Sequence, residues 1–306
     1  MGLYAFDGTW QHSKSDTNVT KFKSAYTGER PFYAEGAGTL LGTRVWDPFV
    51  LIFHLLGLFG GLGDPRTMRN AYAKLCKEWM AGDHDIDIVG YSRGAASALE
   101  FACHVDREGI RDPNSGQQVE KSPTIRFLGL WDTVFFIMDT LTLDEADRLK
   151  TILVRYPPLQ RLFSKKLIDE SGSADFRVPK IVKNTFHALA LNEQRRSFKP
   201  VRLDKVNAHE VWFVGKHGDI GGQTEAKQLS EISLCWMIKK AESCGVSIQP
   251  CEYPPINAND TALSKLKWGS WKRDVREKDL MHFSVPHFAR ETPESISFLV
   301  VEPNDG

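Results

Sequence analysis

The sequence carries no net charge, no apolar run long enough to cross a bilayer and no CxxC pair. Its 39 basic side chains balance 39 acidic ones, which argues against bulk binding of nucleic acid. The five cysteines are an odd number without metal-binding spacing, so we expect neither a disulfide framework nor a zinc site. Because HExxH and phosphate-loop motifs are also missing, we expect no metal and no cofactor.

The N-terminal residues lack the basic region and apolar stretch of a secretory signal peptide. We therefore expect cytoplasmic synthesis, and any export would be independent of such a signal. The most apolar segment, residues 49–62, is too short to span a membrane. It is interpreted either as a buried helix or as an apolar cap beside a lipid-binding site. A third alternative, a surface anchor, would allow transient contact with a membrane surface.

Strand-like and helix-like segments alternate along most of the chain, and this alternation is typical of an α/β fold. We expect one domain over residues 1–306, built on a mostly parallel sheet flanked by helices, with helical cap segments at 46–64 and 133–175. Residues 11–30 are polar and are predicted to be a surface loop. The expected strands are 3–6, 85–89, 124–131, 210–214 and 295–301, and the expected helices are 66–80, 95–106, 184–198 and 229–244.

Four polar clusters directly follow expected strands. Sites in parallel sheets lie at the carboxyl ends of the strands, so these clusters are expected to share one edge. The clusters are Asp7-Gly8-Thr9, residues 90–94, Asp132-Thr133 and His217-Gly218-Asp219.

The cluster at 90–94 reads GYSRG, a serine between two glycines. Small neighbours let a sharp turn pass between strand and helix, and the turn lifts the hydroxyl clear of the sheet. An apolar strand pattern precedes the motif and a helical pattern follows it, which favours Ser92 as a nucleophile over a plain glycine-rich turn. Arg93 is interpreted either as a structural salt-bridge partner or as a contact to a phosphate.

Six motifs occur together and in order: FDGTW, GAGT, GYSRGAA, GLWDTV, FHALALNEQRRSFKP and VWFVGKHGDIGG. In this combination the chain resembles the α/β-hydrolase domain family of type VI secretion phospholipase effectors, the first lipase-effector class, and its uncharacterised relatives. The resemblance runs from residue 4 to about 240. It implies an α/β-hydrolase-type fold and an esterase or phospholipase with a Ser-Asp-His triad.

Carried over by position, the resemblance implies Ser92 as nucleophile, Asp132 as acid and His217 as base. The residue types agree, because a serine hydroxyl needs an imidazole to take its proton and a carboxylate to orient that imidazole. Asp219 is the alternative acid, or it fixes its own loop. His282 and His287 are alternative bases.

The backbone N–H groups of Arg93, Gly8 and Thr9 are candidates for an oxyanion hole. Asp7 is expected to organise its turn instead. Where family members often have small residues after the WDTV motif, this chain has Phe135, Phe136, Ile137 and Met138. We expect these four to line or cap the acyl pocket.

These features predict a cofactor-free serine hydrolase of carboxylic esters, with a lipid or phospholipid acyl ester as substrate. One alternative is a catalytically silent pseudo-hydrolase that serves as a binding module. Another is a thioesterase or peptidase that uses the same triad. Oligomeric state and acyl-chain preference do not follow from the sequence.

Overall fold

Seven parallel strands form the sheet of the computed structural model, in the order β2-β1-β3-β6-β7-β8-β9. The structure describes residues 2–8, 11, 13–36, 65–134, 177–195, 198–204, 208–224, 226–255, 273, 275 and 279–285. The prediction of a mostly parallel α/β sheet is confirmed. The strands are β1 (Gly2–Phe6), β2 (Phe32–Ala34), β3 (Ile86–Tyr91), β6 (Phe127–Trp131), β7 (Thr185–Ala190), β8 (His209–Phe213) and β9 (Leu280–Met281).

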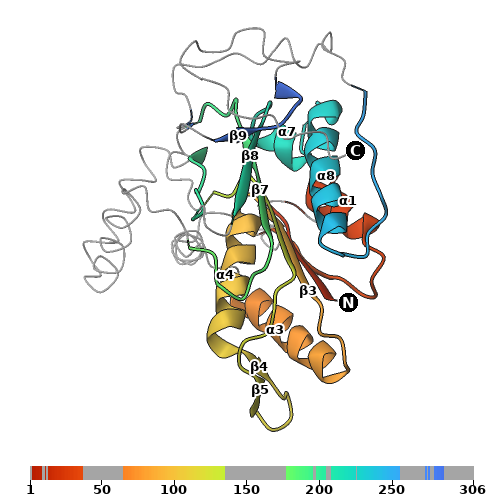
Figure 1. Cartoon of the computed structure of the whole chain (residues 1–306), viewed down its shortest axis with the longest axis vertical. Helices are drawn as coiled ribbons and strands as arrows, with labels where there is room; N and C mark the ends of the chain where they lie inside the picture. Colours follow the sequence, from red (N-terminus) through yellow and green to blue (C-terminus); the bar gives the residue numbers. More distant parts are fainter. Residues whose placement is uncertain are drawn as a thin grey trace, which may run out of the picture.

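Helices cover both faces of the sheet (Figure 1). Helices α1 (Asn18–Ala25) and α8 (Lys227–Ser243) pack on one face, and α3 (Pro65–Met80) and α4 (Arg93–Glu108) pack on the other. Successive strand residues point to opposite faces, so β1 sends Leu3 toward α1 and α8 and Tyr4 toward α3 and α4. A short antiparallel hairpin, β4 (Ile110–Arg111) and β5 (Gln118–Glu120), follows α4.

The predicted loop at 11–30 is wrong over its second half, where α1 forms. The Thr17 side chain caps this helix by accepting a bond from the Thr20 N–H. Asn18 is buried, and its amide donates to the carbonyl of Ile220 and to the Ser233 hydroxyl. Some of the polar residues that suggested a surface loop, Thr17 and Asn18 among them, therefore form hydrogen bonds inside the molecule.

The predicted helix at 184–198 is also wrong, because residues Thr185–Ala190 form β7. Alanine and leucine favour a helix in isolation, but here the segment pairs with β6 on one side and β8 on the other. Backbone pairing with two neighbours and burial of the segment outweigh the local preference. The short strands β2 and β9 were not predicted.

Several predicted segments lie outside the described residues. These are the cap at 46–64, the cap at 133–175 apart from Thr133 and Val134, and the strand at 295–301. Among the helices that the structure does describe, none is both long and apolar enough to cross a membrane.

Candidate active site

The carboxyl ends of three central strands meet at one level of the sheet. Tyr91 of β3 is paired with Trp131 of β6, which is paired in turn with Ala188 of β7. Ser92 directly follows β3 and Asp132 directly follows β6, and the backbone N–H groups of both residues extend this strand pairing. The Ser92 N–H donates to the Trp131 carbonyl at 2.9 Å, and the Asp132 N–H donates to the Ala188 carbonyl at 2.8 Å. The register alone therefore brings Ser92 and Asp132 to the same edge.

Ser92 lies on a strained turn between β3 and α4, with φ 59° and ψ −126°. A positive φ is unfavourable for a residue with a side chain, and such strain clusters at functional sites. Both flanking glycines are required by close packing. A Cβ atom at Gly94 would lie 2.3 Å from the Phe6 carbonyl oxygen, and one at Gly90 would lie 2.6 Å from the Cα of Ala95.

A continuous hydrogen-bonded chain joins Ser92, His217 and Asp132. The Ser92 Oγ lies 2.8 Å from His217 Nε2, and His217 Nδ1 lies 2.7 Å from Asp132 Oδ2. A carboxylate can only accept, so Nδ1 carries the ring proton and Nε2 is left to accept from the serine hydroxyl. All three side chains are buried, with Ser92 5% and His217 4% exposed. This arrangement can remove the hydroxyl proton when the serine oxygen attacks.

Asp132 is held by more than the histidine. Its backbone has φ 42°, and its Oδ1 accepts from the Ala190 N–H at 3.0 Å. Arg273 binds both carboxylate oxygens, with Nη1 on Oδ1 and Nη2 on Oδ2. Burial alone would raise the pKa of the Asp132 carboxyl. The charge of Arg273 and the bond from His217 outweigh that effect and hold the pKa well below its usual value.

His217 begins the five-residue helix α7 (His217–Gly221), which follows β8. Its backbone N–H donates to the Glu193 carboxylate at 3.1 Å. Its ring contacts the rings of Tyr91 and Phe198. The centroid distances are 4.9 Å to Tyr91 and 4.7 Å to Phe198. Glu193 pairs in turn with Arg195 at 2.8 Å. Backbone and ring are therefore both fixed before any substrate binds.

The alternative acid and bases take other contacts. Asp219 caps α7 by accepting from the Lys216 N–H at 2.8 Å, and it also accepts from Thr224. His282 lies directly after β9, where Nδ1 is 2.9 Å from the Ser284 hydroxyl and the ring stacks on Phe213. The structure thus brings Asp132 and His217, and neither alternative, into the chain that ends on Ser92. His287 lies outside the described residues.

The oxyanion candidates differ in what their N–H groups contact. Among the described residues, the Arg93 N–H at the start of α4 has no acceptor. The Gly8 N–H donates to the Asp7 carboxylate at 2.7 Å, so an oxyanion could use it only if that bond opened. Asp7 also accepts from the hydroxyls of Thr17 and Tyr33, as expected of a residue that organises its turn. Thr9 lies outside the described residues.

A second buried histidine supports the segment that carries Asp132. The Thr133 N–H donates to His187 Nε2 at 3.1 Å, and His187 Nδ1 lies 3.0 Å from Glu210 Oε1. Arg202 binds the other oxygen of Glu210 at 2.9 Å and forms a two-bond pair with Asp279. His187 lies in the segment predicted as a helix at 184–198, but it belongs to β7 and bonds between strands.

A family model describes the catalytic domain of Tle1-like phospholipase effectors of the type VI secretion system. It matches this chain over residues 3–122 and 110–240, which is most of its length. The chain belongs to this family. The resemblance seen in the six ordered motifs is confirmed.

Two solved structures resemble the chain at low sequence identity. One is an uncharacterized protein from Pseudomonas aeruginosa, with 18% identity and a TM-score of 0.45 over 84% of this chain and 47% of that chain. This chain therefore spans about half the length of that protein. The other is the Tle1 effector bound to the VgrG spike from the type 6 secretion system. It has 15% identity and a TM-score of 0.53, and the match covers 88% of this chain and 76% of that chain. No curated protein matches.

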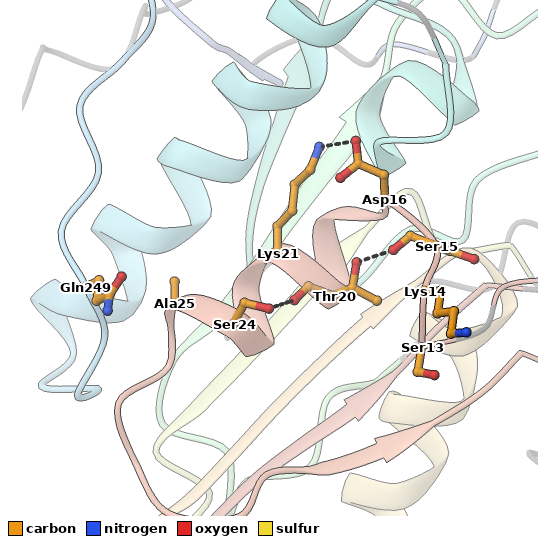
Figure 2. Close-up of a pocket in the computed structure, with 9 residues that line it drawn as sticks. All are labelled: Ser13, Lys14, Ser15, Asp16, Thr20, Lys21, Ser24, Ala25 and Gln249. Carbon is orange, nitrogen blue, oxygen red and sulfur yellow. Dashed lines mark hydrogen bonds and ion pairs between the residues drawn. The ribbon is translucent and has the colours of Figure 1, made fainter.

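The predicted pocket residues Phe135, Phe136, Ile137 and Met138 lie outside the described part of this family member. A polar hollow of about 480 Å³ lies beside α1 (Figure 2). Its lining includes Lys21, which pairs with Asp16, together with Lys14, Gln249, Ala25 and four serine or threonine side chains, but none of the three residues of the hydrogen-bonded chain. Within the described ranges, no three His, Cys, Asp or Glu side chains gather as metal ligands would.

Sequence reasoning missed Arg273, Tyr91 and Phe198 as parts of this family member's site. Tyr91 stands inside the GYSRG motif, and its hydroxyl bonds the His217 carbonyl at 3.2 Å, so attention to the motif's second position could have found it. Arg273 lies 141 positions from Asp132, and nothing in its local sequence distinguishes it from a surface arginine. The Glu193–Arg195 ion pair, in contrast, joins residues only two positions apart in the sequence.

Proposed function

We propose that this chain is a serine hydrolase that cleaves the acyl ester bonds of phospholipids. Ser92 would act as the nucleophile, His217 as the general base and acid, and Asp132 as the group that orients His217. The observation that carries the proposal is the unbroken Ser92–His217–Asp132 chain, with its 2.8 Å and 2.7 Å bonds, on the strained turn after β3. Family membership supports the lipid ester as substrate.

The reaction would proceed through an acyl-enzyme. The Ser92 oxygen attacks the ester carbonyl carbon and passes its proton to His217 Nε2. The tetrahedral intermediate collapses, and His217 returns that proton to the departing alcohol, a lysophospholipid. Water then attacks the acyl-enzyme and gives a proton to His217. The fatty acid leaves, and the Ser92 oxygen regains its proton from His217. Asp132 stays ionised throughout, which agrees with its lowered pKa.

Arg93 supports a phosphate-bearing substrate over a neutral ester. It follows the nucleophile directly, and its Nε is buried with no hydrogen-bond partner among the described residues. Burial lowers the pKa of Arg93 to about 10. Three other arginines with little exposure, Arg126, Arg202 and Arg273, each form a two-bond pair with a carboxylate. A phosphodiester near the scissile ester would supply an anion for Arg93, which pairs with no carboxylate among the described residues.

The experiment compares wild type with Ser92→Ala on phosphatidylcholine vesicles, on diacylglycerol and on a short-chain nitrophenyl ester. Wild type should release fatty acid from phosphatidylcholine and should be labelled by a fluorophosphonate probe. The alanine variant should do neither while it keeps the thermal unfolding of wild type. An unlabelled wild type would support the silent binding module instead. Cleavage of diacylglycerol but not of phosphatidylcholine would contradict the phospholipid part of the proposal.

The same proposal includes synthesis in the cytoplasm and export without a secretory signal peptide. Support comes from membership in a family of type VI secretion effectors. Secretion assays with and without a working type VI apparatus would test it.

A further inference from the structure

Arg273 is bound to the acid of the candidate triad by a two-pronged ion pair. Its Nη1 lies 2.5 Å from Asp132 Oδ1 and its Nη2 lies 3.0 Å from Asp132 Oδ2. Both side chains are fully buried at 0% exposure. Nη2 also donates to the Phe198 carbonyl at 2.6 Å. Because Phe198 packs against the ring of His217, this arginine fixes the acid and one wall of the imidazole site together.

This placement makes two donors share one oxygen. His217 Nδ1 and Arg273 Nη2 both bind Asp132 Oδ2, while Ala190 and Arg273 Nη1 bind Oδ1. A carboxylate whose charge is already balanced by a guanidinium attracts an imidazolium less strongly than a bare carboxylate does. Arg273 therefore keeps Asp132 ionised and in position, and at the same time it weakens the attraction between Asp132 and a charged His217 ring.

The other charged groups around His217 are compensated or screened. Glu193 accepts from the His217 N–H but pairs with Arg195 at 2.8 Å. On α7 and at its cap, Asp219 bonds the Lys216 N–H, and the Lys216 side chain is exposed. Tyr91, which packs on the ring, is neutral at working pH because burial, and then the charges of Asp132 and Asp7, raise its pKa. Among the described residues, Arg273 is the one cation in contact with the acid.

We propose that Arg273 is a positioning residue that locks Asp132 in its strained conformation and extends hydrolysis toward lower pH. The inference rests on the proposed function, since it assigns these roles to Asp132 and His217. Being fully buried, Arg273 cannot reach a substrate, so its effect should fall on kcat and leave KM unchanged. Its charge should also extend hydrolysis toward lower pH.

The test compares Arg273→Met and Arg273→Lys with a matched control, Arg126→Met. Arg126 forms the same kind of pair with Asp87, near the amino end of β3 and far along the strand from Ser92. For Arg273→Met we expect kcat to fall at least tenfold and KM to stay within twofold of wild type. The acid limb of its pH–rate profile should move to higher pH by about one pH unit. Arg273→Lys keeps the positive charge but cannot form the two-bond pair with Asp132. Its kcat should therefore fall, while the acid limb of its pH–rate profile stays in place. Arg126→Met should unfold at a lower temperature than wild type, and its pH–rate profile should be that of wild type.

A second readout separates failure of this inference from failure of the proposed function. Histidine ¹⁵N NMR follows protonation of the His217 ring directly, with His217→Gln to identify its resonance among nine histidines. The pH at the midpoint of this NMR signal change should be higher in Arg273→Met than in wild type, whether or not the protein hydrolyses the chosen ester. An active wild type whose acid limb and midpoint do not move in Arg273→Met would overturn the inference. If the methionine variant does not fold, an Arg273→Lys variant with full wild-type kcat would overturn it instead.

Discussion

His217 and His187 stand in two parallel arrangements that differ at one end. Each ring turns Nδ1 to a buried carboxylate, Asp132 or Glu210, and an arginine also binds that carboxylate. Nε2 of His217 then meets the Ser92 hydroxyl, whereas Nε2 of His187 meets the backbone N–H of Thr133. A hydroxyl can give up its proton to the ring during attack, but a peptide N–H cannot.

A histidine–carboxylate–arginine set does not by itself indicate catalysis. What the Nε2 atom contacts decides the chemistry, and the same set that activates a serine in one place can fix a loop in another. The two sets are also connected, because Thr133 follows Asp132 directly. The His187 set therefore holds the backbone that presents the acid of the His217 set.

The largest expected difference between the two sets comes from neutralising their carboxylates. Asp132→Asn should lower kcat by roughly 10³- to 10⁴-fold, because an amide can hold the wrong imidazole tautomer and cannot balance the imidazolium. Glu210→Gln should cost about 3 kcal/mol or more of unfolding free energy, since it breaks a buried pair with Arg202, but it should lower kcat by only about tenfold. Ester kinetics and urea denaturation measure the two effects. A Glu210→Gln enzyme as inactive as Asp132→Asn would remove the distinction.

Much of the His217 set was predictable because its signals are local. GYSRG encodes a turn whose glycines are dictated by close packing. Asp132 and His217 each follow an apolar strand, so a parallel sheet brings them together. The partners that hold the set could not be predicted in this way. Arg273 reaches Asp132 across 141 positions with no motif around it.

The His187 set was missed for a different reason. Residues Thr185–Ala190 carry helix-forming alanines and a leucine, and only pairing with β6 and β8 makes them a strand. On a helix, His187 would not have faced Glu210. On β7 it is directly opposite Glu210 in the register with β8. A wrong period in the sequence interpretation therefore hid a whole hydrogen-bonded network.

A smaller effect should follow from removing the acceptor for the Thr133 N–H. His187→Leu leaves that buried N–H unsatisfied, which should cost about 1–3 kcal/mol of unfolding free energy and lower kcat by about tenfold as Asp132 shifts. His187→Gln can offer an amide oxygen to the same N–H, so it should recover part of both losses. His104→Leu, on α4, is a control that should keep wild-type kcat. Equal kcat in wild type and His187→Leu would show that the two sets are independent.

The smallest expected effect is on the pH dependence of stability. Burial would raise the pKa of Asp132 and of Glu210, but their histidine and arginine partners outweigh it and lower both values. Each carboxylate therefore stabilises the fold above its unfolded pKa of about 4, and that contribution is lost as pH falls through the lower folded value. Between about pH 5 and 3, Asp132→Asn and Glu210→Gln should each flatten the fall in unfolding free energy by up to about 1.4 kcal/mol per pH unit. Urea denaturation across this range measures the slope, and Ser92→Ala, which changes no charge, should keep the wild-type slope. If only one of the two carboxylate variants flattens it, the charge balance of the two sets differs despite their matching geometry.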